Sequence, residues 1–212
     1  MNQIDIYSDI GESFWGESVS ASDVKTMLED MEGDITVRIN SHGGSVFDGF
    51  AIYNLLDQHE GEIHVKVDAM AASAASVIAM AGDTIEMADN ALMMIHDPWT
   101  IAIGDSADLA KTADLLDKIK DSIVTTYKSK SDLDTSEIEQ MMSDETWFSA
   151  DEAIENGFAT AKTGELAKAM NSIDKPWMNK APKIEKTENE ESINTAFLNN
   201  RKRKLKLLMA DA

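Results

Sequence analysis

Residues 35–67 read ITVRINSHGGSVFDGFAIYNLLDQHEGEIHVKV, and they decide the fold. Apolar and polar residues alternate over 35–39 and again over 63–67, which predicts two strands that each bury one face. Between these strands, residues 46–56 carry apolar side chains at helical spacing after a Gly-Gly turn. A strand, a helix and a strand within this length form a βαβ unit, which is right-handed and builds a parallel sheet. The sequence therefore predicts an α/β protein.

Further elements extend this unit in both directions along the chain. Short apolar stretches predict strands at residues 4–6, 84–87 and 92–95. A capping sequence at Ser20–Asp23 predicts the start of one helix. A second at Ser149–Glu152 predicts the start of another, which ends at Gly157. The alanine-rich residues 69–81 predict a buried helix. Helical spacing of apolar residues predicts a long helix over 106–130 and a short one over 136–142.

The composition excludes several classes of protein. The chain has 212 residues, 43% apolar and 27% charged, as is typical of globular proteins. No apolar run approaches the roughly 18 residues of a membrane span, and the first residues lack a signal-peptide pattern. The chain contains no cysteine, which excludes disulfides, thiolate metal sites and a cysteine nucleophile. We therefore expect a cytoplasmic protein that makes no membrane contact.

The charge is distributed unevenly between the body and the end of the chain. The formal net charge is −20, and it divides into −24 for residues 1–174 and +4 for residues 175–212. Such an acidic body is a poor binder of nucleic acid, because phosphate contacts need clustered cations. We expect one domain over residues 1–168, followed by a flexible linker and basic tail over 169–212. The basic run 201–206 is either a solvated tail or a docking peptide for an acidic surface.

Three features of the sequence could carry chemistry. The Gly43-Gly44 turn could direct backbone N–H groups at an anion or an oxyanion, although such a pair is usually only a turn. Ser73 follows a strand and opens a helix, as a nucleophile does, although a serine among alanines is usually a packing residue. Ser76, one helical turn later, is its alternative and is expected to be buried. His96 ends an apolar strand, where its side chain could reach a cleft.

No cofactor or metal site is expected from these features. The glycine turn lacks the spacing of nucleotide-binding loops. No pair of histidines has the spacing of metal ligands on a helix, and no thiolate is available.

Four segments in order carry a family resemblance. They read INSHGGSV at 39–46, MAASAAS at 70–76, MIHDP at 94–98 and WFSADEA at 147–153. Over about residues 4–165 the chain resembles the Clp protease proteolytic subunit (ClpP) family of serine peptidases. Residues 73–83, Pro98-Trp99 and 145–147 resemble its phage branch most, the ClpP-like head maturation proteases encoded beside capsid genes.

The resemblance implies roles for individual residues. Ser73 matches the family nucleophile and His96 matches the general base. Gly44 and Ala74 match the two positions whose backbone N–H groups form the oxyanion hole. Glu145 matches the third triad position.

Three positions depart from the family pattern. The third triad residue is usually Asp, so Glu145 is a departure, and Asp144 is the alternative. His42 stands where the housekeeping enzymes carry Pro. Little room precedes Ile4 for the segments that line the axial pore and meet an ATPase in those enzymes, which argues against an unfoldase partner.

The resemblance also implies an architecture and a function. The fold would be ClpP/crotonase-like, with a small second sheet and a long protruding helix over 106–130 that interleaves two homo-oligomeric rings. The function would be ATP-independent cleavage of phage capsid or scaffold protein during prohead maturation, in the bacterial cytoplasm or inside the immature head. The tail would dock cargo or scaffold, or be trimmed by the enzyme itself.

Three alternatives stay open at this point. The first is a housekeeping-type subunit that degrades proteins with an unfoldase ATPase. The second is a catalytically dead ring or scaffold component. The third is a crotonase-like acyl-CoA enzyme, which shares the architecture and the oxyanion hole but does not need Ser73 with His96.

Overall fold

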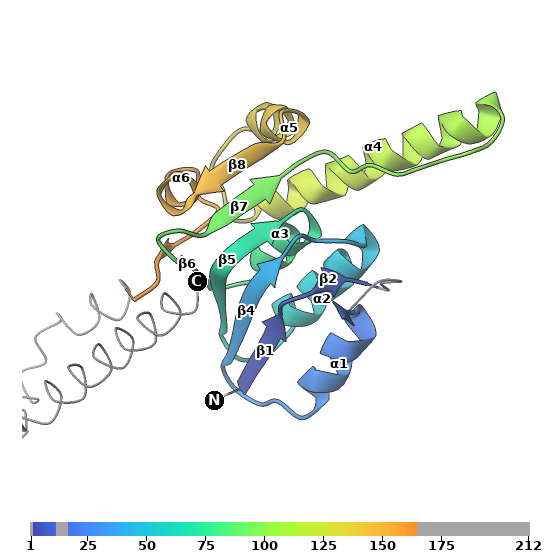
Figure 1. Cartoon of the computed structure of the whole chain (residues 1–212). Helices are drawn as coiled ribbons and strands as arrows, with labels where there is room; N and C mark the ends of the chain where they lie inside the picture. Colours follow the sequence, from blue (N-terminus) through green and yellow to red (C-terminus); the bar gives the residue numbers. More distant parts are fainter. Residues whose placement is uncertain (1, 12–16, 165–212) are drawn as a thin grey trace, which may run out of the picture. The chain divides into compact units, whose positions relative to one another are not determined.

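A largely parallel sheet forms the framework of the protein (Figure 1). The computed structural model describes residues 2–11 and 17–164. Five strands of this described part lie side by side in the order β1 (Asn2–Ile6), β4 (Ile35–Ser41), β5 (Ile63–Ala72), β6 (Thr84–Met87) and β9 (Ala161–Lys162). These strands are parallel, as the βαβ unit predicts. The predicted α/β class is therefore confirmed.

Two further pairings complete the strands. β7 (Leu92–Ile95) pairs in parallel with the second half of β5 and antiparallel with β8 (Thr146–Ser149). β2 (Asp9–Ile10) and β3 (Ser18–Val19) form a separate two-stranded sheet. The small second sheet that the resemblance implies is thus present. β5 is long because its first half pairs with β6 and its second half with β7.

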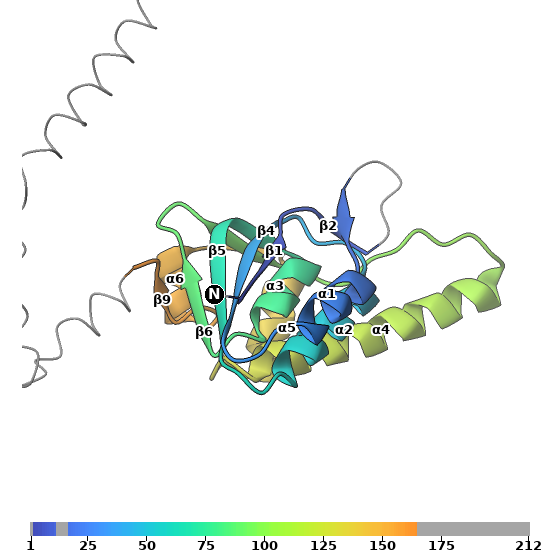
Figure 2. The same ribbon diagram turned by 90° about the horizontal axis from the view of Figure 1, so that it is seen from below.

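Helices pack against the sheet, and two of them begin where the sequence predicts capping boxes. Three of them lie along one face of the sheet (Figure 2): α1 (Ala21–Glu29), α2 (Val46–Asp57) and α3 (Ala74–Ala79). α4 (Ser106–Lys128) contacts α3, and α5 (Thr135–Ser143) and α6 (Ala150–Glu155) lie by β8. Ser20 and Asp23 form the capping box of α1, and Ser149 and Glu152 form that of α6, both as predicted.

The core lies between the sheet and these helices. Every second residue of β4 is buried, from Ile35 to Ser41, and the first five residues of β5 alternate in the same way. The opposing helices supply buried aliphatic side chains such as Ile52 and Ile78. Burying each such side chain stabilises the fold by roughly 1.5–3 kcal/mol before entropy is counted. This rigid layer fixes the ends of the strands from which the site is built.

The helix predicted over residues 69–81 is wrong in its first part. Residues Met70, Ala71 and Ala72 continue β5 and pair with Leu92, Met93 and Met94 of β7. Pairing with a strand some 20 residues away outweighs the local helical preference of alanine. The helix is therefore confined to Ala74–Ala79, and Ser73 stands alone between strand and helix.

The long helix α4 projects from the body (Figure 1). Asp105 caps its start, and it ends at Lys128, two residues before the predicted end. The inner half of its apolar stripe is buried, as at Ile119 and Ile123, whereas Leu109 and Leu115 of the outer half are exposed. No helix of the described part is long and apolar enough to cross a membrane. The linker and tail predicted over residues 169–212 lie outside the described residues.

Candidate active site

Ser73 occupies a strained turn between β5 and α3. Its backbone has φ 55° and ψ −126°, a conformation that costs a residue with a side chain about 1–3 kcal/mol. Hydrogen bonds hold it there, because its N–H donates to Met94 O at 3.0 Å and its carbonyl accepts from Ser76 N–H at 2.9 Å. The side chain is left half-buried, with its hydroxyl directed at a cleft. This strand–turn–helix geometry matches the arrangement of a nucleophile.

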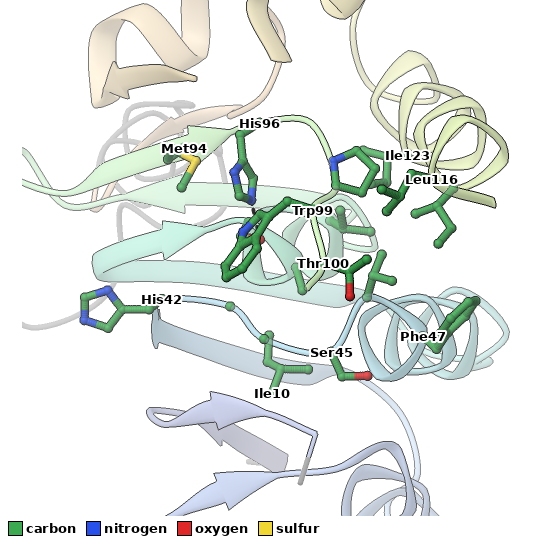
Figure 3. Close-up of a pocket in the computed structure, with 18 of the residues that line it drawn as sticks. Ile10, His42, Ser45, Phe47, Met94, His96, Trp99, Thr100, Leu116 and Ile123 are labelled. Atoms are coloured by element: carbon green, nitrogen blue, oxygen red, sulfur yellow. Dashed lines mark hydrogen bonds between the residues drawn. The ribbon is translucent and has the colours of Figure 1, made fainter. Parts of the chain in front are cut away.

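His96 reaches Ser73 from the end of β7 (Figure 3). Its Nε2 lies 2.8 Å from Ser73 Oγ. The register of the sheet brings Ser73 and His96 together. Ala72 at the end of β5 pairs with Met94 of β7, and the strands end at or just beyond that pair. When Ser73 donates this hydrogen bond, the proton of the neutral imidazole is on Nδ1. Nε2 is then free to act as a general base toward the Ser73 hydroxyl.

The glycine turn lies directly against the Ser73 backbone. Gly43 and Gly44 have φ of 97° and 148°. A Cβ on Gly43 would stand 2.7 Å from Ser73 Cβ and 2.9 Å from Ala74 N, and one on Gly44 would stand 2.2 Å from Ile10 O. The turn therefore requires glycine at both positions.

Hydrogen bonds fix the turn and leave one donor free. Ile10 N–H donates to Gly43 O at 2.9 Å, and Ser45 N–H donates to Ile10 O at 2.8 Å. Gly44 lies between these two bonds and is exposed, and no described residue accepts its N–H. The position of Gly44 and the closeness of the turn to Ala74 N agree with two donors beside one oxyanion. The oxyanion hole itself stays a prediction.

A cavity of about 790 Å³ opens beside the Ser73–His96 pair. Figure 3 shows Leu116 and Ile123 of α4 on one side of it and His96 and Trp99 on the other. Val77 of α3 and Phe47 of α2 add to an apolar lining. His42 is exposed at the glycine turn and also lines the cavity. Such a cavity can hold an apolar side chain next to the Ser73 hydroxyl.

Comparisons with known proteins agree with this geometry. A family model described as Clp protease matches residues 3–161, which is most of the chain and includes the whole candidate site. The chain belongs to the Clp protease family. It is a serine peptidase of that family, with the α/β fold and long helix that the resemblance implies.

Individual relatives in the Clp protease family are moderately similar. ATP-dependent Clp protease proteolytic subunit 1 of Prochlorococcus marinus is 28% identical over 166 residues, 72% of this chain and 85% of the relative. The proteolytic subunit of Bacteroides thetaiotaomicron is 32% identical over 126 residues, 58% of this chain and 57% of the relative. That of Leuconostoc citreum is 31% identical over 160 residues, 70% of this chain and 80% of the relative. The phage branch stays a prediction.

Glu145, which matches the third triad position of the Clp protease family, makes no hydrogen bond to His96. Glu145 is exposed, and its Oε1 accepts only a long hydrogen bond of 3.4 Å from Trp147 Nε1. The alternative, Asp144, accepts from Gln140 Nε2 at 2.9 Å. Within the described residues, no hydrogen bond joins His96 to a carboxylate. Glu145 as third triad member stays a prediction.

The sequence did not predict the contact between two buried polar residues, Ser76 and Tyr127. Ser76 is fully buried, as predicted, but it is hydrogen-bonded to Tyr127 of α4 at 2.8 Å. Burial raises the pKa of Tyr127 well above its usual value, and the hydrogen bond to Ser76 lowers it by less. The signal that could have found the pair is the place of Tyr127 on the buried stripe of a long amphipathic helix.

Proposed function

We propose that this chain is a serine endopeptidase in which Ser73 is the nucleophile and His96 is the general base. The observation that carries this proposal is the 2.8 Å contact between Ser73 Oγ and His96 Nε2, on a strained turn beside a large apolar cavity. A serine with only a packing role does not require a histidine partner, a strained backbone or an adjacent cleft. Because Ser73 has all three, a catalytic role explains it better.

The geometry supports a two-step hydrolysis. Ser73 Oγ attacks the carbonyl carbon of a peptide while His96 Nε2 takes the hydroxyl proton. The backbone N–H groups of Gly44 and Ala74 stabilise the oxyanion that forms. His96 returns the proton to the amine as the C–N bond breaks, which leaves an acyl ester on Ser73. Water, deprotonated by His96, then hydrolyses the ester and frees the hydroxyl. Removing one oxyanion donor costs about 10²–10³ in rate in a comparable enzyme.

The cavity favours substrates with a large apolar side chain at the cleaved position. Its lining includes the apolar side chains of Val77, Leu116, Ile119 and Ile123. A side chain that enters this space loses its contact with water, which favours leucine or phenylalanine over aspartate or lysine.

Assembly into homo-oligomeric rings belongs to the same proposal. The relatives named here are proteolytic subunits, and membership of the family implies ring assembly. Trp99, Ile101 and Ile103 are between 71% and 98% exposed, and they precede the outer half of α4, where Leu109 and Leu115 are also exposed. An apolar surface of this kind needs a covering partner. A second copy of the chain supplies it in a ring.

Two biological settings remain for the peptidase. Relatives from three organisms are named ATP-dependent Clp protease proteolytic subunits, and these names favour feeding by an unfoldase ATPase. Head maturation on capsid or scaffold protein rests on the phage-like motifs at residues 73–83 and 145–147. The comparisons therefore support the unfoldase-fed setting better than the head maturation setting.

Fluorophosphonate labelling followed by intact mass measurement tests the chemistry. We expect one adduct on the wild-type protein and none on Ser73→Ala or His96→Ala, because only an activated serine reacts with this reagent. Labelling of Ser73→Ala at the wild-type rate would show that the nucleophile is wrong. No labelling of the assembled wild type would favour the dead ring or scaffold component.

A second experiment separates the two settings. The purified protein is given a tagged folded substrate with a bacterial Clp unfoldase and ATP, and separately a capsid or scaffold protein without ATP. Degradation that requires the unfoldase supports the first setting, and limited cleavage of the capsid or scaffold protein without ATP supports the second. Ser73→Ala is the control in both arms.

A further inference from the structure

Ser76 lies at the centre of a buried set of hydrogen bonds beneath Ser73. Its Oγ lies 2.6 Å from Ser73 O, 2.9 Å from Met94 O and 2.8 Å from the Tyr127 hydroxyl. Ser76 is 0% exposed and Tyr127 is 1% exposed, so water does not complete this set. The four groups come from the Ser73 turn, α3, β7 and α4.

The chemistry of the groups fixes the direction of these bonds. Both carbonyl oxygens can only accept, and Ser76 has one proton, so its hydroxyl donates to the carbonyls. Tyr127 then donates to Ser76 Oγ, because the described residues offer no other acceptor for its buried hydroxyl proton. A chain of donors thus runs from Tyr127 through Ser76 to Ser73 O and Met94 O.

The two carbonyls belong to the segments that carry the nucleophile and the base. Ser73 O is the nucleophile's own carbonyl, and Met94 O also accepts from Ser73 N–H at 3.0 Å. Met94 lies two residues before His96 on β7. One hydroxyl therefore ties the strained turn to the strand that positions the base. Tyr127 adds the inner end of α4 to the same tie.

From these contacts we propose that Ser76 and Tyr127 are positioning residues of the peptidase: they hold the Ser73 turn and the His96 strand at reacting distance and couple both to α4. The proposal rests on the proposed function of Ser73 and His96. Neither Ser76 nor Tyr127 bonds to Ser73 Oγ or His96 Nε2, and Tyr127 also lines the cavity. Their effect is on the 2.8 Å contact, because a displacement of about 1 Å between reacting groups can cost 10²-fold in rate.

The test compares Ser76→Ala, Tyr127→Phe and the double variant in peptide hydrolysis and fluorophosphonate labelling. We expect Ser76→Ala to lower kcat and the labelling rate by about 10–100-fold, with KM within about twofold. We expect a smaller loss, about 3–10-fold, for Tyr127→Phe, because Ser76 can still donate to the carbonyls. The pH dependence of kcat should keep its wild-type shape, since His96 is untouched.

In the double variant, Tm should recover while kcat stays low. Ser76→Ala strands the buried Tyr127 hydroxyl without a partner, which lowers Tm. Adding Tyr127→Phe removes that hydroxyl and should recover much of the Tm, but it should leave kcat at the level of Ser76→Ala. Recovery of kcat together with Tm would show that the pair is only structural and would overturn the proposal.

Ser131→Ala is the matched control. Ser131 is also buried, donates to Asn156 O at 2.6 Å and accepts from Leu133 N–H at 3.2 Å, and it does not line the cavity. We expect a lowered Tm with wild-type kcat. Wild-type labelling and kcat in both Ser76→Ala and Tyr127→Phe would overturn the proposal. If Ser76→Ala does not fold, the kcat and labelling rate of Tyr127→Phe test the proposal, and wild-type values would overturn it. An unlabelled wild type would contradict the proposed function instead.

Discussion

Ser73 and Glu145 share a rare backbone conformation but differ in how firmly they are held. They are the non-glycine residues of the described part with positive φ, at 55° and 50°. At Ser73 the N–H and the carbonyl are both hydrogen-bonded, and the side chain meets His96. These contacts compensate for a strain of about 1–3 kcal/mol.

Glu145 has a much weaker set of contacts. Its N–H donates to Met142 O at 3.2 Å, and its side chain accepts a single bond at 3.4 Å from the half-exposed Trp147. That distance exceeds the usual range for an N–H···O bond, about 2.7–3.2 Å. The comparison shows that Ser73 and His96, the proposed nucleophile and base, contact each other within one chain, whereas no hydrogen bond joins Glu145 to His96.

Substitution of Ser73 should give the largest effect. Ser73→Ala and Ser73→Gly both lack the nucleophile, so we expect peptide cleavage to fall at least about 10⁴-fold in each. Only glycine tolerates φ 55° with ψ −126° without strain, so Ser73→Gly should unfold with a free energy about 1 kcal/mol higher than Ser73→Ala. Denaturant unfolding of the two variants measures the difference. Equal stabilities would mean that the turn at Ser73 stores no strain.

Substitution of Glu145 should give an effect that depends on assembly. In the unassembled chain we expect Glu145→Gln to label within about twofold of the wild type, because no contact joins the carboxylate to His96. In the assembled ring we expect a loss of about 10²-fold, since a triad carboxylate there stabilises the imidazolium. Labelling rates of size-separated fractions measure both numbers.

Asp144→Asn is the control for Glu145→Gln. Asp144 bonds to Gln140 on its own helix turn, and we expect wild-type labelling in both fractions. Loss of labelling in Asp144→Asn but not in Glu145→Gln would identify Asp144 as the third triad residue. Wild-type rates for both variants in the ring would remove both carboxylates from the triad.

The sequence predicted those parts of the site that local patterns determine. Alternation defined β4 and the first half of β5, and a serine capping box defined the start of α6. The nearness of Ser73 and His96 came from the family resemblance, since residues 23 positions apart have no local signal of contact. The glycine turn was found by its residue types, and the structure shows that a Cβ there has no room.

The remaining features depend on contacts between distant segments. The pairing of Ala72 with Met94 converts an alanine-rich stretch from helix to strand, and only the sheet can specify it. Ser76 and Tyr127 are 51 residues apart, so their contact needs α4 to be in place. The direction of the Glu145 side chain depends on its positive φ, which residue type does not reveal because glutamate rarely adopts it.

The smallest effect should come from the hydroxyl of Tyr127, which is buried and bonds to Ser76 beneath Ser73. Because burial raises its pKa above the ordinary value of 10.0, the native state keeps the proton at a pH where the unfolded state has lost it. The free energy of unfolding of the wild type should therefore fall as the pH rises through 10, by up to about 1.4 kcal/mol per pH unit from this group.

Tyr127→Phe lacks this group, so the difference in unfolding free energy between the two proteins isolates it. We expect that difference to be constant from pH 7 to about 9 and then to shift in favour of Tyr127→Phe at higher pH. The pKa of Tyr7 is also raised, by its hydrogen bond to Asp68, but that residue is present in both proteins and its contribution cancels. Parallel curves up to about pH 11 would mean that Tyr127 ionises as easily in the native state as in the unfolded chain. The hydroxyl would then be accessible to water, and it could not act as the fixed donor that holds Ser76 beneath the nucleophile.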